Sequence, residues 1–141
     1  DEHYRTGPLH PIRPSVRLLK RCAKAGLKIA IATSSKAECT ENVVRRLSLG
    51  PYVQAVAVAE AVERCKPAPD IFLLAAKLLE VSPDECIVIE DADKGVDAAK
   101  AAGMKAIGLK RRGSMQSLSH ADAVVRCLRL MSVERLRGLV E

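Results

Sequence analysis

The chain has 141 residues, of which 48% are hydrophobic and 28% are charged. This is the length of one domain, and the composition is typical of a soluble globular protein rather than a disordered or fibrous one. No apolar run approaches the roughly 20 residues that a membrane-spanning helix needs, so we expect no membrane association. The net charge is +6, and the segment 105–141 contributes +5 of it, with eight Lys or Arg against three Asp or Glu. Such a basic segment is either a solvated surface or a region that attracts anionic ligands.

The cysteines and the start of the chain bear on its cellular setting. There are five cysteines, an odd number, with no Cys-x-x-Cys pair and no histidine at metal-ligand spacing. This pattern favours free thiols in a reducing compartment, which we expect to be the cytoplasm, with an organelle such as a plastid left open. Residues 1–5 do not resemble a signal peptide and include no initiator methionine, so we expect a piece of a longer protein.

Apolar periodicity and Gly/Pro punctuation predict alternating helices and strands. We expect residues 1–13 to form a linker or entry loop and residues 14–141 to form a single core domain. The predicted helices are 15–25, 37–47, 71–80, 95–102 and 132–140, with a helical turn at 60–64. The predicted strands are 27–32, 55–59, 86–90 and 104–109, with a short edge strand at 122–125. Asp70 is placed to cap the helix that follows it.

Two stretches, 23–31 and 100–108, share one pattern: a helix end, a glycine and then a strand. Alternation of helix and strand predicts an α/β fold, with a mostly parallel sheet and helices on both of its faces. Right-handed crossovers place the carboxyl ends of all parallel strands at one edge of the sheet. That edge is where α/β proteins bind their ligands.

Polar side chains follow three of the predicted strands at the point where each strand ends. A hydroxyl cluster at 33–35 follows the first, Lys66 follows the second, and Glu90 and Asp91 end the third. Hydroxyl and ammonium groups bind phosphate oxygens, and helix N-termini favour negative charge. Carboxylates hold Mg²⁺, which prefers oxygen ligands. The ordered set therefore predicts a phosphate site with a divalent cation, which suits phosphoryl transfer.

Each member of this set also has a purely structural explanation. The hydroxyls can end a strand or cap a helix, Lys66 can be a surface lysine, and the acids can cap the next helix. Successive side chains of a strand point to opposite faces, so Glu90 and Asp91 converge only if the strand bends there.

Three segments resemble motifs of the haloacid dehalogenase (HAD) superfamily, in its β-phosphoglucomutase-like branch with the CbbY-type sugar-phosphate phosphatases. Lys-Ile-Ala-Ile-Ala-Thr-Ser-Ser at 28–35 resembles the second motif of that family. Lys-Pro-Ala-Pro-Asp-Ile-Phe at 66–72 resembles the third, and 86–104 resembles the fourth. Pro-Ile-Arg-Pro-Ser-Val at 11–16 resembles the return to the core after the cap domain, so 1–13 would be the end of that cap.

The resemblance implies a Rossmann-like three-layer core and a Mg²⁺-dependent phosphatase or phosphomutase acting on a small phosphorylated metabolite such as a sugar phosphate. In that family's pattern, Thr33 and Ser34 bind the phosphate. Lys66 is the catalytic lysine that bridges phosphate and nucleophile, and Glu90 and Asp91 are the magnesium ligands. We expect the intact protein to be a monomer.

The chain also departs from the family. Its members open with a strand ending in Asp-x-Asp-Gly-Thr, whose first aspartate forms an aspartyl phosphate, followed by a helical cap; this chain holds neither. In the family's fold that strand is central, between the strands predicted here at 27–32 and 86–90. An internal Asp-x-Asp at 91–93 is not expected to replace it, because no hydroxyl-tipped strand and lysine follow it. We therefore expect residues 1–141 alone to be inactive.

Other functions remain open at this point. The chain could be a non-catalytic binding or regulatory module that has lost its nucleophile. The basic run at 110–112 could bind nucleic acid, but the aromatic side chains that stack on bases are missing from the basic segment, so we do not expect it. A response-regulator receiver uses similar groups, but in the reverse order along the chain, so we do not expect this function.

Overall fold

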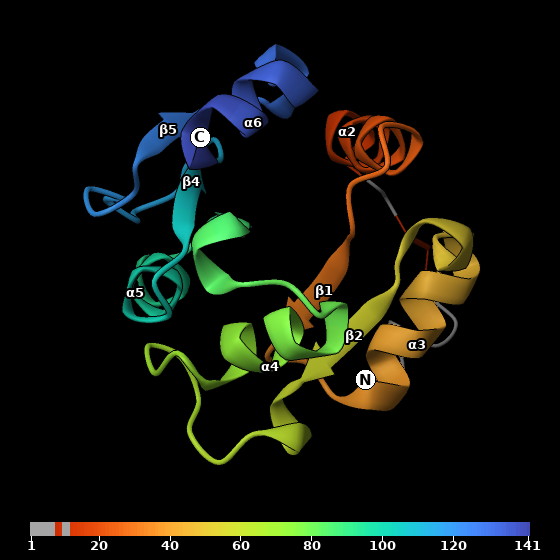
Figure 1. Cartoon of the computed structure of the whole chain (residues 1–141). Helices are drawn as coiled ribbons and strands as arrows, with labels where there is room; N and C mark the ends of the chain where they lie inside the picture. Colours follow the sequence, from red (N-terminus) through yellow and green to blue (C-terminus); the bar gives the residue numbers. More distant parts are fainter. Residues whose placement is uncertain (1–7, 10–11) are drawn as a thin grey trace.

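The computed structural model describes residues 8, 9 and 12–141 (Figure 1). Most of the predicted linker at 1–13 therefore lies outside the described residues. The helices are α2 (Arg13–Lys24), α3 (Ala37–Arg46), α4 (Asp70–Leu79), α5 (Asp93–Ala101) and α6 (Val133–Val140). The strands are β1 (Ala30–Thr33), β2 (Ala55–Val58), β3 (Ile87–Glu90), β4 (Lys105–Leu109) and β5 (Ala123–Val125). Short 3₁₀ turns lie at Gly50–Tyr52, Ala59–Ala61, Pro83–Glu85 and Leu128–Leu130.

Every helix and strand that the sequence predicts is present, and the differences lie at their ends. β1 begins at Ala30 rather than at 27, because the preceding residues bond elsewhere. The N–H of Leu27 donates to Cys22 O of α2, and the N–H of Ile29 donates to Gln54 Oε1 at 2.7 Å. The first residues of the predicted strand therefore form the joint between helix and strand.

The prediction that Asp70 caps α4 is wrong. Asp70 is the first residue of that helix, Pro69 occupies the cap position, and no side-chain cap bond is present. The Asp70 carboxylate instead accepts the N–H of Arg64 at 3.2 Å and pairs with its guanidinium at 2.8 Å. The hydrogen bonds from Arg64 lower the pKa of Asp70 from its usual value. This pair closes the loop that carries Lys66.

The two repeated joints are confirmed in detail. Gly26 and Gly103 both adopt left-handed backbone, with φ of +83° and +79°. Glycine takes this conformation without the steric cost that a Cβ brings. Each glycine stops its helix and turns the chain into the next strand, β1 or β4.

All strand pairs are parallel, as predicted, but they form two sheets. β1 pairs with β2, and β4 lies between β3 and β5. Within the described residues no ladder joins β1 to β3, so each of these strands has one unpaired edge. This split falls between the two strands that flank the central strand in the family's fold.

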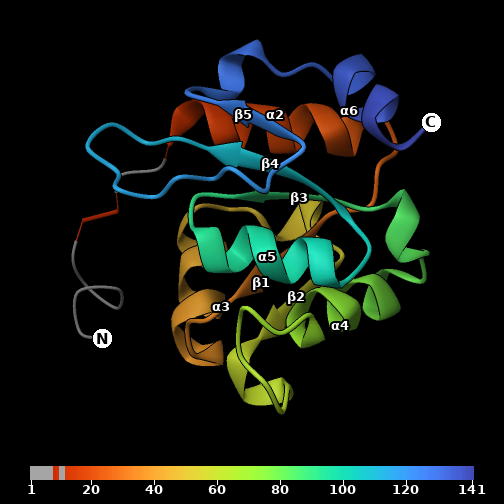
Figure 2. The same cartoon turned by 90° about the vertical axis from the view of Figure 1, so that its left-hand side faces the viewer.

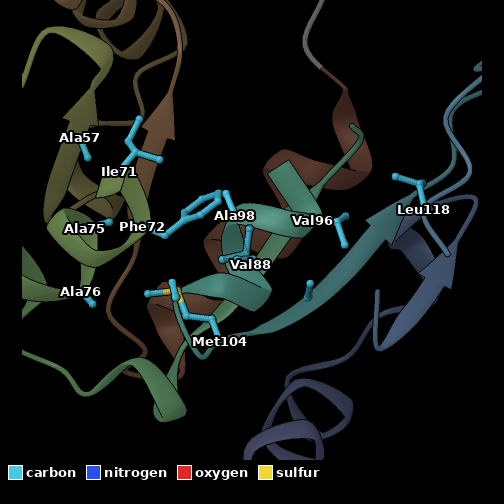
Figure 3. Close-up of a cluster of buried hydrophobic side chains, with 13 residues drawn as sticks. Ala57, Ile71, Phe72, Ala75, Ala76, Val88, Val96, Ala98, Met104 and Leu118 are labelled. Atoms are coloured by element: carbon cyan, nitrogen blue, oxygen red, sulfur yellow. The ribbon is translucent and has the colours of Figure 1, made fainter. Parts of the chain in front are cut away.

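Helices cover both faces of the strands and make three layers (Figure 2). α2 and α6 lie on one side of β3 and β4, and α5 lies on the other. One buried cluster joins α4 and α5 to both sheets, and Figure 3 shows Phe72 of α4 pointing toward Val88 and Ala98. A second cluster packs Leu18 of α2 and Leu136 of α6 around Ile107 of β4.

Within the described residues, no helix is both long and apolar enough to cross a bilayer.

Candidate active site

The predicted site residues lie at the carboxyl ends of the strands. Thr33 is the last residue of β1, opposite Val58 of β2. Glu90 is the last residue of β3, opposite Gly108 of β4. Lys66 lies in the loop between β2 and α4. Parallel pairing thus brings the ends of these strands to one edge of each sheet.

Lys66 and Glu90 are the predicted site residues that touch directly. Lys66 Nζ lies 2.6 Å from Glu90 Oε1, and both side chains are only 13% exposed. The ammonium also lies 4.9 Å from the centre of the Phe72 ring, where a cation is attracted to the aromatic face. This ion pair joins the β2–α4 loop to the end of β3 and so spans the split between the two sheets.

The second carboxylate oxygen of Glu90 binds the turn that leads into α5. Oε2 accepts the N–H groups of Asp91 at 3.0 Å and Ala92 at 3.1 Å. Gly95 makes room for this arrangement, because a Cβ there would overlap the Glu90 carboxyl group. Ala92 occupies the cap position of α5 and no side-chain cap bond is present, so Glu90 orders the turn before this helix rather than capping it.

Asp91 faces the solvent at the same edge, with 48% of its side chain exposed. Its Oδ2 lies 3.5 Å from a guanidinium nitrogen of Arg111, in the loop after β4. The described residues contain no group of three or more His, Cys, Asp or Glu that could hold a metal. Glu90 and Asp91 offer the oxygen donors that Mg²⁺ prefers, but two carboxylates are only part of its octahedral shell. The two carboxylates therefore fit part of a magnesium site, in which Asp91 offers the more open oxygens.

The hydroxyls at the end of β1 lie in a turn. Thr33 Oγ1 accepts the N–H of Ser35 at 3.0 Å, and Ser34 is exposed. Glu60 Oε2 accepts the N–H of Ala37 at the start of α3. No hydrogen bond or ion pair in the described part of the chain joins Thr33 or Ser34 to Lys66. The structure therefore aligns the hydroxyls and the lysine along one edge without bringing them into contact.

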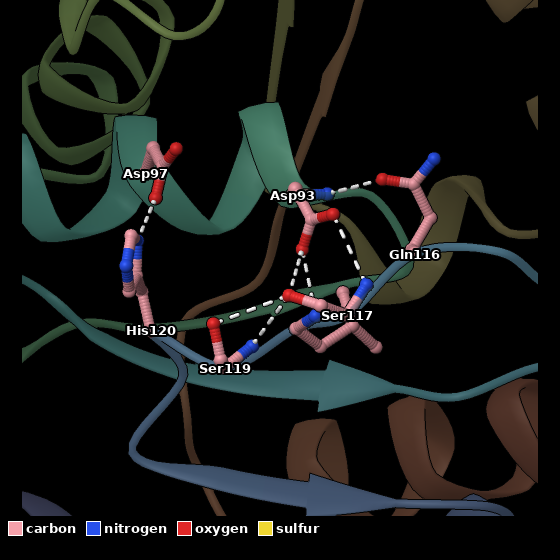
Figure 4. Close-up of polar contacts among 7 residues, drawn as sticks. Asp93, Asp97, Gln116, Ser117, Ser119 and His120 are labelled. Atoms are coloured by element: carbon pink, nitrogen blue, oxygen red, sulfur yellow. Dashed lines mark hydrogen bonds and ion pairs between the residues drawn. The ribbon is translucent and has the colours of Figure 1, made fainter.

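Asp93, the second acid of the internal Asp-x-Asp, is committed to a structural role (Figure 4). Its carboxylate accepts the N–H groups of Leu118 at 2.6 Å and Ser117 at 3.1 Å, and its own N–H donates to Gln116 Oε1. These bonds, that of Leu118 first, lower the pKa of Asp93. The carboxylate fastens the loop 110–120 to α5 and is not placed as a nucleophile.

This loop is expected to be held best at mildly acidic pH. Asp93 has a folded pKa below its ordinary 3.8, so its contribution is present above that value and is lost as pH falls below it. The hydrogen bond with Asp97 raises the pKa of His120 above its ordinary 6.5. The contribution of His120 is therefore present below that value and is lost as pH rises through the folded pKa. The protection factors for amide hydrogen exchange at Ser117 and Leu118 should be highest between these limits. Asp93→Asn should remove the loss of protection at acid pH, and a profile that this variant leaves unchanged would contradict the role of Asp93.

Two hollows of about 220 and 380 Å³ lie along α2, and none of the predicted site residues lines either of them. Arginine side chains, with Lys20, dominate the larger one. The residues predicted to form the site lie instead at the open edge around Lys66 and Glu90.

Comparison with known proteins identifies the family. The profile described as haloacid dehalogenase-like hydrolase matches residues 2–109. The chain belongs to this family. Relatives and structural neighbours place it in the β-phosphoglucomutase and CbbY-like branch, as the sequence motifs predict.

Two curated relatives show the extent of the match. The chain is 39% identical over 120 residues to the β-phosphoglucomutase of Bacillus subtilis, covering 85% of this chain and 51% of that protein. It is 35% identical over 121 residues to hexitol phosphatase A of Escherichia coli, covering 86% of this chain and 56% of that protein. The chain thus spans about half the length of these relatives.

Solved structures agree with this assignment. The β-phosphoglucomutase of Clostridium difficile superposes with a TM-score of 0.79 at 31% identity, covering 90% of this chain and 55% of that one. CbbY of Rhodobacter sphaeroides, solved in complex with phosphate, gives 0.75 at 26% identity, covering 82% and 53%. The Rossmann-like α/β fold predicted from the sequence is therefore confirmed.

Proposed function

We propose that the chain is the core part of a Mg²⁺-dependent phosphatase or phosphomutase that acts on a small phosphorylated metabolite, such as a sugar phosphate. Membership of the hydrolase family and similarity to a phosphoglucomutase and a hexitol phosphatase support this proposal. The observation that carries it is the buried contact of Lys66 with Glu90 at the strand ends. An ammonium fixed there can neutralise phosphate charge at a defined position.

In this proposal one group of residues binds the phosphate and another binds the metal. Thr33 and Ser34 donate to phosphate oxygens, while Lys66 bridges phosphate and nucleophile. Glu90 and Asp91 hold Mg²⁺, which supplies charge neutralisation on the phosphate oxygens when bound. Both oxygens of Glu90 already have protein partners, so Asp91 is the more open of the two carboxylates.

The nucleophile would come from outside these 141 residues. β1 and β3 each have an unpaired edge, which suits a further parallel strand between them. A strand ending in Asp-x-Asp at that position would place its carboxylates at the edge that Lys66 and Glu90 already occupy. The assignment of 14–141 as a partial core and 1–13 as the end of a cap remains part of this proposal, as do a monomeric intact protein and a reducing compartment.

Metal binding by the isolated chain tests the assignment of Asp91. Mg²⁺ titration followed by amide NMR should shift the signals of Asp91 and Ala92 at millimolar concentrations. Asp91→Asn should weaken the apparent affinity about tenfold, because it removes a charged oxygen ligand. Asp97→Asn removes one carboxylate from α5, the helix that follows Asp91, and is the matched control that should change little. Equal effects of the two variants would argue against a metal site at Asp91.

A non-catalytic module is the second candidate function. Such a module would bind a phosphorylated ligand at the same edge without turnover, even when all residues encoded upstream are present.

A further inference from the structure

The loop 110–120 carries three Lys or Arg residues and one histidine but no Asp or Glu, and the proposed function leaves it without a role. It connects β4 to β5 at the edge of the sheet that holds Asp91. In Figure 2, β4 lies on the far side of β3 from β1. The loop therefore reaches the candidate site from the side opposite to Thr33 and Ser34.

This loop is firmly attached. Asp93 binds the N–H groups of Ser117 and Leu118, and the side chain of Leu118 is fully buried. Gly108 packs so closely beneath it that a Cβ there would lie 2.9 Å from Leu118 Cβ. The ammonium of Lys110 donates to Gln116 O within the loop. These contacts fix the backbone from which the next residue, Arg111, extends.

Arg111 contacts the candidate site, and most of its guanidinium donors remain available for a ligand. Its guanidinium lies 3.5 Å from Asp91, and its side chain is 55% exposed. A guanidinium has five N–H donors in a planar fork that matches the oxygens of a phosphate or a carboxylate. One long contact leaves most of these donors open. Among the described residues, Asp91 is the one ion-pair partner of the Arg111 side chain.

We propose that Arg111 is a specificity-determining residue that binds a second anionic group of the substrate, a phosphate or a carboxylate, at the end away from the transferred phosphate. This rests on the proposed function. Thr33, Ser34 and Lys66 receive the phosphate that is transferred. Arg111, on the other side of Asp91, meets the remote end of the same molecule. Asp93 acts as a positioning residue for Arg111 through the loop.

The test uses the protein as its gene encodes it, including any residues upstream of Asp1. Initial rates are measured for fructose 1-phosphate and for fructose 1,6-bisphosphate at about 0.15 M salt, where exposed charges more than about 8 Å apart are largely screened. Arg111→Ala should lower kcat/KM for the bisphosphate about tenfold, through KM, because a charge-assisted contact is lost. It should change kcat/KM for the monophosphate less than about twofold.

Arg112→Ala is the matched control, since it removes the same charge from the neighbouring, exposed residue. It should leave the ratio of the two kcat/KM values within about twofold. The inference is overturned if Arg111→Ala leaves the ratio unchanged, or if Arg112→Ala changes it equally. Turnover of neither substrate by the wild-type protein would overturn the proposed function and this inference together. Turnover of both with no effect of Arg111→Ala would overturn the inference alone.

Discussion

Gly95→Ala is expected to destabilise the protein by about 2–3 kcal/mol, although alanine normally stabilises a helix relative to glycine by about 1 kcal/mol. The new Cβ would overlap the carboxyl group of Glu90, which is held by Lys66 and by two backbone N–H groups. Relief requires Glu90 to move and its hydrogen bonds with the N–H groups of Asp91 and Ala92 to break. Urea denaturation followed by circular dichroism measures the change.

A second glycine gives the control for this substitution. Gly138 lies in α6 with nothing near the position of a Cβ, so Gly138→Ala should stabilise by about 0.5–1 kcal/mol. Removal of the obstructing side chain should also rescue the variant, because Gly95→Ala in a Glu90→Ala background has no carboxyl group to overlap. If Gly95→Ala stabilised as Gly138→Ala does, the close packing of Glu90 on α5 would be refuted.

Lys66→Ala is expected to cost about 3 kcal/mol of unfolding free energy, because it leaves the Glu90 carboxylate without its cation in a mostly buried position. Glu90→Gln should cost less, since a neutral amide can still accept the two backbone N–H groups. The combined Lys66→Ala and Glu90→Gln variant should be more stable than the sum of the single losses predicts. The coupling energy from this cycle measures the interaction between the two residues.

The exposed pair of Arg64 with Asp70 serves as the comparison, because its arginine is 68% exposed. Exposed ion pairs are screened by water, so Arg64→Ala should change the denaturation midpoint far less than Lys66→Ala. Equal losses for Arg64→Ala and Lys66→Ala, or additive losses in the cycle, would show that the Lys66–Glu90 pair does not join the two halves of the molecule.

The sequence predicts the alternation of elements because apolar periodicity reports which face of each segment is buried. It also places Thr33, Lys66 and Glu90 at one edge, since parallel strands share a direction. It does not reveal the packing of Glu90 against the start of α5, because that depends on the free space above Gly95. A glycine in the first turn of a predicted helix, five residues after an acid, was the available signal.

Contacts between distant segments were harder to predict. The bonds of Asp93 with Ser117 and Leu118, and the ion pair of Arg111 with Asp91, join residues 20 or more positions apart. Periodicity carries no information about such pairs, and the basic run at 110–112 indicated only a general attraction for anions. The split into two sheets was not predicted, because it depends on whether β1 and β3 pair across the sheet and no local sequence pattern reports that.

Magnesium-dependent hydrolysis of a sugar phosphate is the measurement that tests the account most directly. It compares the isolated chain of residues 1–141 with the protein as its gene encodes it, including any residues upstream of Asp1. The account predicts no turnover by the isolated chain. It predicts turnover by the encoded protein that is abolished by EDTA and by Lys66→Ala. Robust Mg²⁺-dependent turnover by the isolated chain, or none by the encoded protein, would contradict it.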